Sequence, residues 1–140
     1  MINPRLRIVL VDTDHSRRLS IEKNLGHLGY YRVVPVSSLH ELIALMDNAV
    51  DVFDLLVINE DVLSVAGIRL ENLLREYSCI RHSLIYKSTE LHVFSGTQAI
   101  FPSSRFFASG VPDQPVLAQV MNRLEVPAGS DFYNSLPATT

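Results

Sequence analysis

The chain has 140 residues, which fits a single domain, since domains commonly span roughly 100–200 residues. Hydrophobic residues make up 47% of it, charged residues 19%, and the formal net charge is −3, so we expect a buried core and no direct binding of nucleic acid. We expect neither a membrane span nor a signal peptide, because no apolar run is long enough. The single cysteine, Cys79, excludes an internal disulfide and is typical of a cytoplasmic protein.

The first elements of the chain alternate between strand and helix patterns. The apolar run LRIVLVD at residues 6–12 predicts a strand that is covered on both faces. The period of residues 16–28 predicts an amphipathic helix, and Gly29 fits its C-terminus. The segment YRVVPVSS at residues 31–38 predicts a second strand, which Pro35 favours at a sheet edge or a bulge.

The middle of the chain repeats this order. A capping-box pattern, Ser38 followed by Glu41, predicts the start of a second helix. We expect that helix to bury its apolar residues, which are Leu39, Leu42, Ile43, Met46 and Val50. The segment FDLLVIN at residues 53–59 predicts a third strand that ends at Asn59, followed by a solvated acidic loop. A third helix is then marked by Leu70, Leu73, Leu74 and Tyr77.

The last part of the chain is less regular. Residues 82–88 (HSLIYKS) predict a fourth strand, and residues 104–109 (SRFFAS) a short fifth strand. Between them, Gly96 and Pro102 predict a short or irregular fourth helix. Asp113 is placed to cap a last helix with Val116, Val120, Met121 and Leu124 facing inward. We interpret residues 1–125 as the domain and residues 126–140, rich in Pro, Gly, Ser and Thr, as a linker or tail.

Five repeats of strand and helix predict an α/β fold with a parallel sheet and helices on both faces. Chemistry in such sheets is found beyond the carboxyl ends of the strands. The residues at those ends are Asp12, Thr13, Asp14, Asn59, Glu60, Asp61, Ser88 and Ser109.

Four segments, in this order, resemble the receiver domain of bacterial response regulators over about residues 6–125. They are IVLVDTDHSRR, DLLVINEDVLSVAGI, SLIYKST and RFFASGVPDQPVLAQVMNRL. The resemblance implies a flavodoxin-like, doubly wound (βα)5 fold whose five-stranded sheet has the order 2-1-3-4-5. It also implies a mechanism: an aspartate at the tip of the third strand accepts a phosphoryl group, and acids after the first strand help to hold Mg²⁺.

Some positions keep the chemistry of that family. Asp12 matches the first acid, and Gly67 matches the glycine of the loop after the acceptor. Ser88 matches the switch hydroxyl, and Phe106 matches the aromatic residue of the fifth strand that changes rotamer.

Other positions depart from the family. Thr13 stands where the second acid belongs, and Asp14 is acidic but one position late. Asn59 occupies the phosphoacceptor position, and its amide is a poor nucleophile without a charge for Mg²⁺. Ser109, or Ala108 if the register slips by one, stands where the family has lysine.

These departures predict a degenerate receiver, or pseudo-receiver, that is not an enzyme and uses no metal or cofactor. We expect it to act in a bacterial signalling or transcription regulator as a protein-interaction module or homodimer. The expected surface is the face of the fourth helix, fifth strand and fifth helix, with Phe94, Phe101 and Phe106 as candidate contacts. An output domain beyond Thr140 is a further expectation, suggested by the composition of the tail.

Several alternatives stay open from the sequence. The same fold can hold a small-molecule ligand over the strand tips, or retain weak phosphorylation at Glu60 or Asp61. Asp12, Asp14 and Asp61 are candidates for weak binding of a divalent cation, and the alternative role of Asp14 is to cap the first helix. The five histidines have no zinc-ligand spacing, and no nucleophile elbow or glycine-rich phosphate loop is present in the sequence. A further alternative is a flavodoxin-like enzyme that uses flavin, and a colourless purified protein would argue against it.

Overall fold

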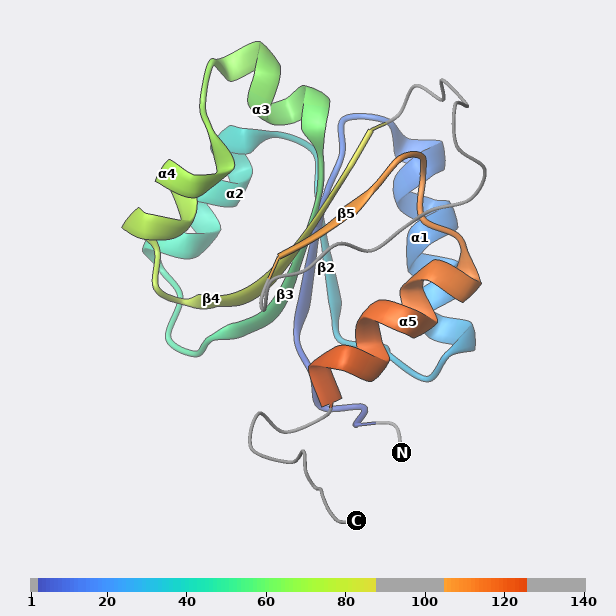
Figure 1. Ribbon diagram of the computed structural model, residues 1–140. Coiled ribbons are helices and arrows are strands. Elements are labelled where there is room, and N and C mark those ends of the chain that lie inside the picture. Colours follow the sequence, from blue (N-terminus) through green and yellow to red (C-terminus); the bar gives the residue numbers. More distant parts are fainter. Residues whose placement is uncertain (1–2, 88–104, 126–140) are drawn as a thin grey trace, which may run out of the picture.

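The computed structural model describes residues 3–87 and 105–125, which form a single parallel sheet flanked by helices (Figure 1). The strands are β1 (Ile8–Val11), β2 (Val33–Val36), β3 (Phe53–Asn59), β4 (Ile80–Tyr86) and β5 (Arg105–Ala108). Their order in the sheet is β2-β1-β3-β4-β5, which confirms the predicted flavodoxin-like arrangement. Because all pairs are parallel, the carboxyl ends of the strands meet at one edge, beside the starts of α1 and α3.

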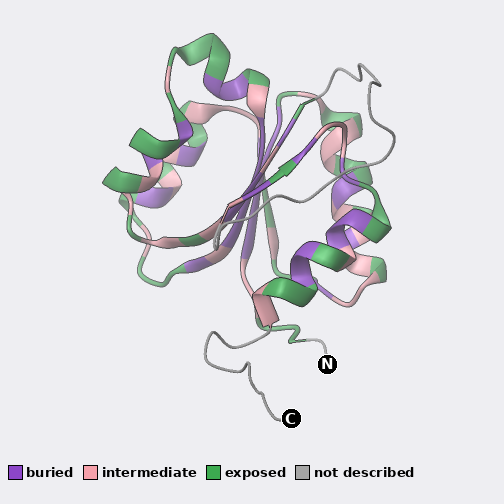
Figure 2. Ribbon diagram, viewed as in Figure 1, coloured by how far each residue is buried: buried purple, intermediate pink, exposed green. Residues whose placement is uncertain are grey.

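Helices cover both faces of the sheet. Figure 1 shows α1 (His15–His27) and α5 (Gln114–Glu125) on one side, and α2 (Leu39–Asp47), α3 (Glu60–Ala66) and α4 (Leu70–Glu76) on the other. Strand residues alternate between the two layers, so that Ile8 and Leu10 pack in one core cluster while Val9 and Val11 pack in the other. Figure 2 shows the strands buried between the layers, which explains their near-continuous apolar sequences.

Short-range hydrogen bonds begin three of the helices as predicted. The Asp14 carboxylate accepts hydrogen bonds from the amides of Ser16 (2.8 Å) and Arg17 (3.2 Å) and so caps α1. Ser38 caps α2 by accepting from the amide of Glu41 (3.1 Å), although Glu41 reaches back to the amide of Ser37 (2.9 Å) rather than to that of Ser38. Asp113 accepts from the amide of Val116 (3.1 Å) at the start of α5.

Strand β2 lies at one edge of the sheet, as Pro35 predicted. The carbonyls of Arg32 and Val36 accept hydrogen bonds from the amides of Ile8, in β1, and Asp12, directly after it. Because donors and acceptors alternate along a parallel pair, Val33 and Pro35 turn their backbone groups to the free edge. Proline lacks an amide hydrogen, so its position removes one donor from an edge that another strand could otherwise extend.

The structure corrects two predictions in the middle of the chain. Helix α3 begins directly after β3, where a solvated loop was expected, because Asn59 caps it and Val62 and Leu63 are buried beneath it. Gly67 then ends α3 with a φ of 70°, and α4 is the helix that was predicted third. Val50 is 95% exposed, since α2 ends at Asp47 and the chain has left the helical period by then.

Several predictions fall on parts of the chain that are not described. Ser88, the irregular fourth helix with Phe94 and Phe101, and the tail at residues 126–140 all lie outside residues 3–87 and 105–125. Within those ranges, no helix is long and apolar enough to cross a lipid bilayer.

Candidate functional site

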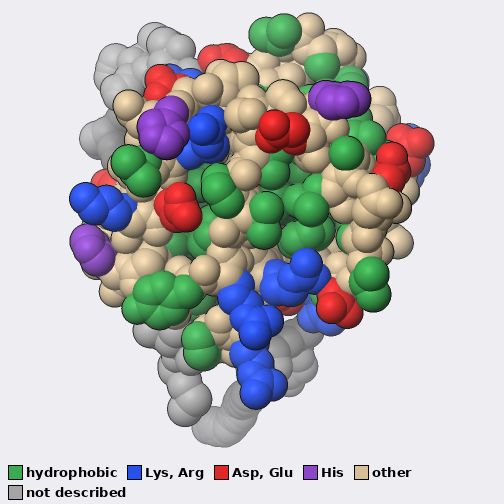
Figure 3. All heavy atoms as spheres, turned by 180° about the vertical axis from the view of Figure 1, so that it is seen from behind, with side chains coloured by type: hydrophobic (Ala, Val, Ile, Leu, Met, Phe, Trp, Pro, Cys, Tyr) green, Lys and Arg blue, Asp and Glu red, His purple; other side chains and the backbone are tan. Residues whose placement is uncertain are grey.

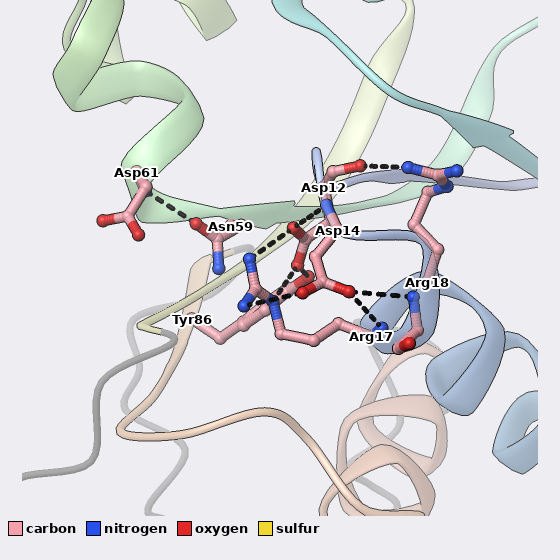
Figure 4. Close-up of polar contacts among 8 residues, drawn as sticks. Asp12, Asp14, Arg17, Arg18, Asn59, Asp61 and Tyr86 are labelled. Atoms are coloured by element: carbon pink, nitrogen blue, oxygen red, sulfur yellow. Dashed lines mark hydrogen bonds and ion pairs between the residues drawn. The ribbon is translucent and has the colours of Figure 1, made fainter.

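Asp12 is the centre of a buried polar cluster at the tip of β1 (Figure 4). Its side chain is fully buried and accepts four hydrogen bonds from three residues. Arg17 donates two of them, from Nε to Oδ2 and from Nη2 to Oδ1, both at 2.8 Å. The Tyr86 hydroxyl donates to Oδ2 at 2.5 Å, and the amide of Asp14 donates to Oδ1 at 2.9 Å. Both carboxylate oxygens are therefore occupied by partners within the protein.

Two adjacent arginines in the first turn of α1 hold the end of β1. Arg17 forms the paired contact with the Asp12 carboxylate, and its Nη1 also lies 3.4 Å from the Asp14 carboxylate. Arg18 donates from Nη1 to the backbone carbonyl of Asp12 at 2.6 Å and lies 3.3 Å from His15 Nδ1. A planar guanidinium matches a carboxylate with two parallel hydrogen bonds. Arg17 therefore orients the Asp12 carboxylate as well as balancing its charge.

Tyr86 brings β4 into the cluster from across the sheet. It is fully buried, and its backbone is in register with Asn59 of β3. Burial raises the pKa of the Tyr86 hydroxyl, and the hydrogen bond to Asp12 raises it further, so the hydroxyl stays a donor. Burial alone raises the pKa of Asp12, but hydrogen bonds from Arg17, Tyr86 and Asp14 outweigh it and hold that pKa below its usual value. Asp12 is therefore a carboxylate at neutral pH.

Asn59 lies at the expected phosphoacceptor position, but its side chain caps a helix. Its side chain is 1% exposed, and Oδ1 accepts a hydrogen bond from the amide of Asp61 (2.8 Å) at the start of α3. Its Nδ2 has no hydrogen-bond partner within the described residues. The amide is near enough to Tyr86 to lower the pKa of that hydroxyl slightly, although the larger influences raise it. Asn59 is thus a buried helix cap.

The remaining site candidates differ in how they relate to this cluster. Asp14 belongs to it, through its amide on Asp12 and its carboxylate beside Arg17, and also caps α1, whereas Thr13 is exposed. Ser109 is half-buried just after β5, and Asp61 is exposed in the first turn of α3.

The structure also changes which aromatic residue of β5 reaches the surface. Phe106 is 1% exposed and packs with the core on the α1 and α5 side, which corrects the expectation that it forms part of a partner surface. Its neighbour Phe107 points to the other face of the sheet and is 42% exposed. Alternation along a strand places neighbours on opposite faces, so a shift of one position decides between core and surface.

The cation that a receiver fold implies does not fit these residues. Mg²⁺ prefers carboxylate and other oxygen ligands that are free to coordinate it. Both oxygens of Asp12 already accept hydrogen bonds from Arg17 and Tyr86, and Asn59 contributes no charge. Among residues 3–87 and 105–125, no group of three or more His, Cys, Asp or Glu side chains is arranged to hold a metal ion.

Sequence reasoning missed Arg17 and Tyr86, the two side chains that close the site. Arg17 follows Asp12 by five positions, on the first turn of a helix whose cap was predicted. That spacing was a usable signal, because the first turn faces back toward the strand end. Tyr86 is 74 residues from Asp12 along the chain, and only the strand order brings them together.

One solved structure among the comparisons with known proteins supports the fold. No family model matches the chain, and no curated protein matches it. A response regulator receiver domain protein from Bacillus halodurans superposes with a TM-score of 0.57 at 16% identity, covering 86% of this chain and 94% of that one. A putative pilus assembly-related protein from Burkholderia pseudomallei has a TM-score of 0.48 at 21% identity, covering 64% of this chain and 66% of that one. The chain therefore has a receiver-like fold.

Proposed function

We propose that this chain is a receiver-like signalling module that works without phosphorylation and acts by binding protein, as a homodimer or with a partner. The observation that carries the proposal is that the polar side chains at the tips of β1 and β3 are buried and engaged in contacts within the protein. Asn59, in place of an acceptor carboxylate, is a buried helix cap, and the nearest buried carboxylate, Asp12, has both oxygens occupied. An amide is uncharged and weakly nucleophilic, so no group at this position is suited to accept a phosphoryl group.

The β5 edge of the sheet offers an interaction surface. Phe107 is 42% exposed there, beside a hollow lined by residues of α3, α4, β4 and β5. Apolar side chains, including Ile68 and Ile85, contribute to this hollow, as do Arg105 and Glu71, whose charged groups lie 3.7 Å apart. An exposed aromatic side chain next to apolar surface and paired charges is a common anchor at protein interfaces.

The opposite edge of the sheet, at β2, also exposes apolar side chains. Leu19, Tyr31 and Val34 are 50%, 73% and 37% exposed. Figure 3 views the molecule from this side and shows hydrophobic side chains gathered near the centre of the face, with charged side chains around them. We assign the interaction to the β5 edge because the expected face includes the fifth strand and because Phe107 adjoins a hollow.

Sedimentation equilibrium over a range of concentrations tests the interaction. We expect reversible dimers, or a stable complex with a captured partner, that Phe107→Ser weakens at least about tenfold, as expected for the loss of an aromatic anchor. Tyr31→Ser is the matched comparison, since it removes a more exposed aromatic residue from the opposite edge. A loss of association in Tyr31→Ser with none in Phe107→Ser assigns the surface to the β2 edge and contradicts the proposal for β5.

As part of the same proposal, the module belongs to a cytoplasmic regulator of transcription or signal transduction. Its role there is to bring protein partners together, and the chemistry of signal transfer is carried by other parts of the system.

A further inference from the structure

The guanidinium of Arg17 lies between two carboxylates at the tip of β1. Its Nε and Nη2 are each 2.8 Å from an oxygen of Asp12, and its Nη1 is 3.4 Å from an oxygen of Asp14. Asp12 is fully buried, while the Arg17 side chain is 28% exposed and reaches the carboxylate from the surface of α1. One positive charge is therefore held between two negative charges, in contact with both.

We infer that Arg17 is a built-in counter-ion that takes the place of the divalent cation implied by the fold. A buried carboxylate needs a compensating charge, and Arg17 supplies it through a paired contact that leaves neither Asp12 oxygen open to a metal. The Tyr86 hydroxyl closes the remaining approach to Oδ2. A metal ion could bind here only by displacing both side chains.

With Arg17 as the counter-ion, the site does not require a metal ion. A metal ion is exchangeable, whereas Arg17 is covalently part of α1 and cannot be lost to solvent. Through Asp12, the counter-ion connects α1 to β1, and Tyr86 connects the same carboxylate to β4. The strand tips are therefore held in one arrangement that does not depend on the concentration of divalent cations. The inference concerns cation occupancy and does not rest on the proposed binding of protein.

Binding of Mn²⁺, followed by the loss of its free electron paramagnetic resonance signal, tests the inference on the whole chain. We expect wild type to bind Mn²⁺ weakly, and Arg17→Ala to bind it at least about tenfold more tightly, because the variant leaves a buried carboxylate without a counter-ion. The gain should disappear in the double variant Arg17→Ala with Asp12→Asn. Arg18→Ala is the matched control, since Arg18 contacts the backbone carbonyl of Asp12 and not its carboxylate.

Arg17→Gln is a second variant in case Arg17→Ala does not fold, because glutamine can still donate one hydrogen bond to Asp12. A folded Arg17 variant that binds Mn²⁺ no better than wild type would overturn the inference. So would tight binding of Mn²⁺ by wild type that Asp12→Asn abolishes, and this second result does not require any Arg17 variant to fold. Neither result depends on dimerisation or phosphorylation, so the failure of this inference is distinguishable from failure of the proposed function.

Discussion

Replacing Tyr86 with phenylalanine removes one hydroxyl and leaves the ring that packs in the core. In the structure, that hydroxyl donates a 2.5 Å hydrogen bond to the Asp12 carboxylate, and both side chains are fully buried. Hydrogen bonds to charged groups contribute about 1.5–3 kcal/mol each to stability. Asp12 keeps its other three hydrogen bonds, from Arg17 and Asp14, so the larger cost of about 3–5 kcal/mol for an unpaired buried charge does not apply. We therefore expect Tyr86→Phe to lose about 2 kcal/mol.

Urea unfolding at neutral pH, followed by circular dichroism, measures this loss. The midpoint should fall while the slope of free energy against urea stays that of wild type, since the fold is unchanged. Tyr77→Phe is the matched control, because Tyr77 also donates to an aspartate, Asp47, at 2.9 Å, but at the surface, where we expect little change. If Tyr86→Phe loses no more stability than Tyr77→Phe, the buried cluster does not stabilise the fold as we describe.

Three further predictions concern other parts of the structure. Because the pKa of Asp12 is held below its usual value of 3.8 in the folded protein, its charged form contributes stability above that value. This contribution is lost as the pH falls below 3.8 and through the folded pKa, so Asp12→Asn should show a shallower loss of stability than wild type over that acid range in urea unfolding. Leu117→Ala, at a fully buried position of α5, should cost about 2–5 kcal/mol by thermal and urea unfolding, and a cost below that range would contradict the described packing of α5. Gly67→Ala should cost about 1–2 kcal/mol through its φ of 70° alone, since a Cβ there meets no atom within 4 Å, and an unchanged stability would refute the left-handed end of α3.

Much of the fold was predictable because it depends on periodic burial. Strand β3 begins and ends where its apolar run does, at Phe53 and Asn59, and Pro35 placed β2 at an edge. The helix caps were predictable for a related reason, since Asp14 and Ser38 act on amides two or three residues away. Such contacts are local and leave a pattern in the sequence.

The errors came from features that local patterns do not determine. Residues after β3 carry two acids, which suggested a solvated loop, but acids in a first turn also favour a helix start, and burial of Val62 and Leu63 decided for α3. Phe106 and Phe107 are equally aromatic, and only the register of β5 against β4 decides which of them is buried. In the sequence, Val50 continues the apolar period of α2, but the helix has already ended at Asp47.

The site was predictable only in part. The sequence placed Asp12 and Asn59 at neighbouring strand tips, and the register of β1, β3 and β4 agrees with this. The contact between Asp12 and Arg17 depends on the direction of a side chain in the first turn of α1. The contact with Tyr86 depends on a strand residue 74 positions from Asp12 along the chain. The sequence therefore indicated which groups the site lacks, and the structure was needed to find the contacts that replace them.

Incubation with acetyl phosphate and Mg²⁺, followed by intact-mass spectrometry, tests the central claim most directly. A receiver domain with an intact phosphoacceptor aspartate serves as the positive control. Our account predicts that the wild-type chain keeps its unmodified mass, and that Asn59→Asp also does so, because Arg17 and Tyr86 still occupy the oxygens of Asp12. A mass increase of one phosphoryl group on wild type, at Asp61 or any other residue, would contradict it.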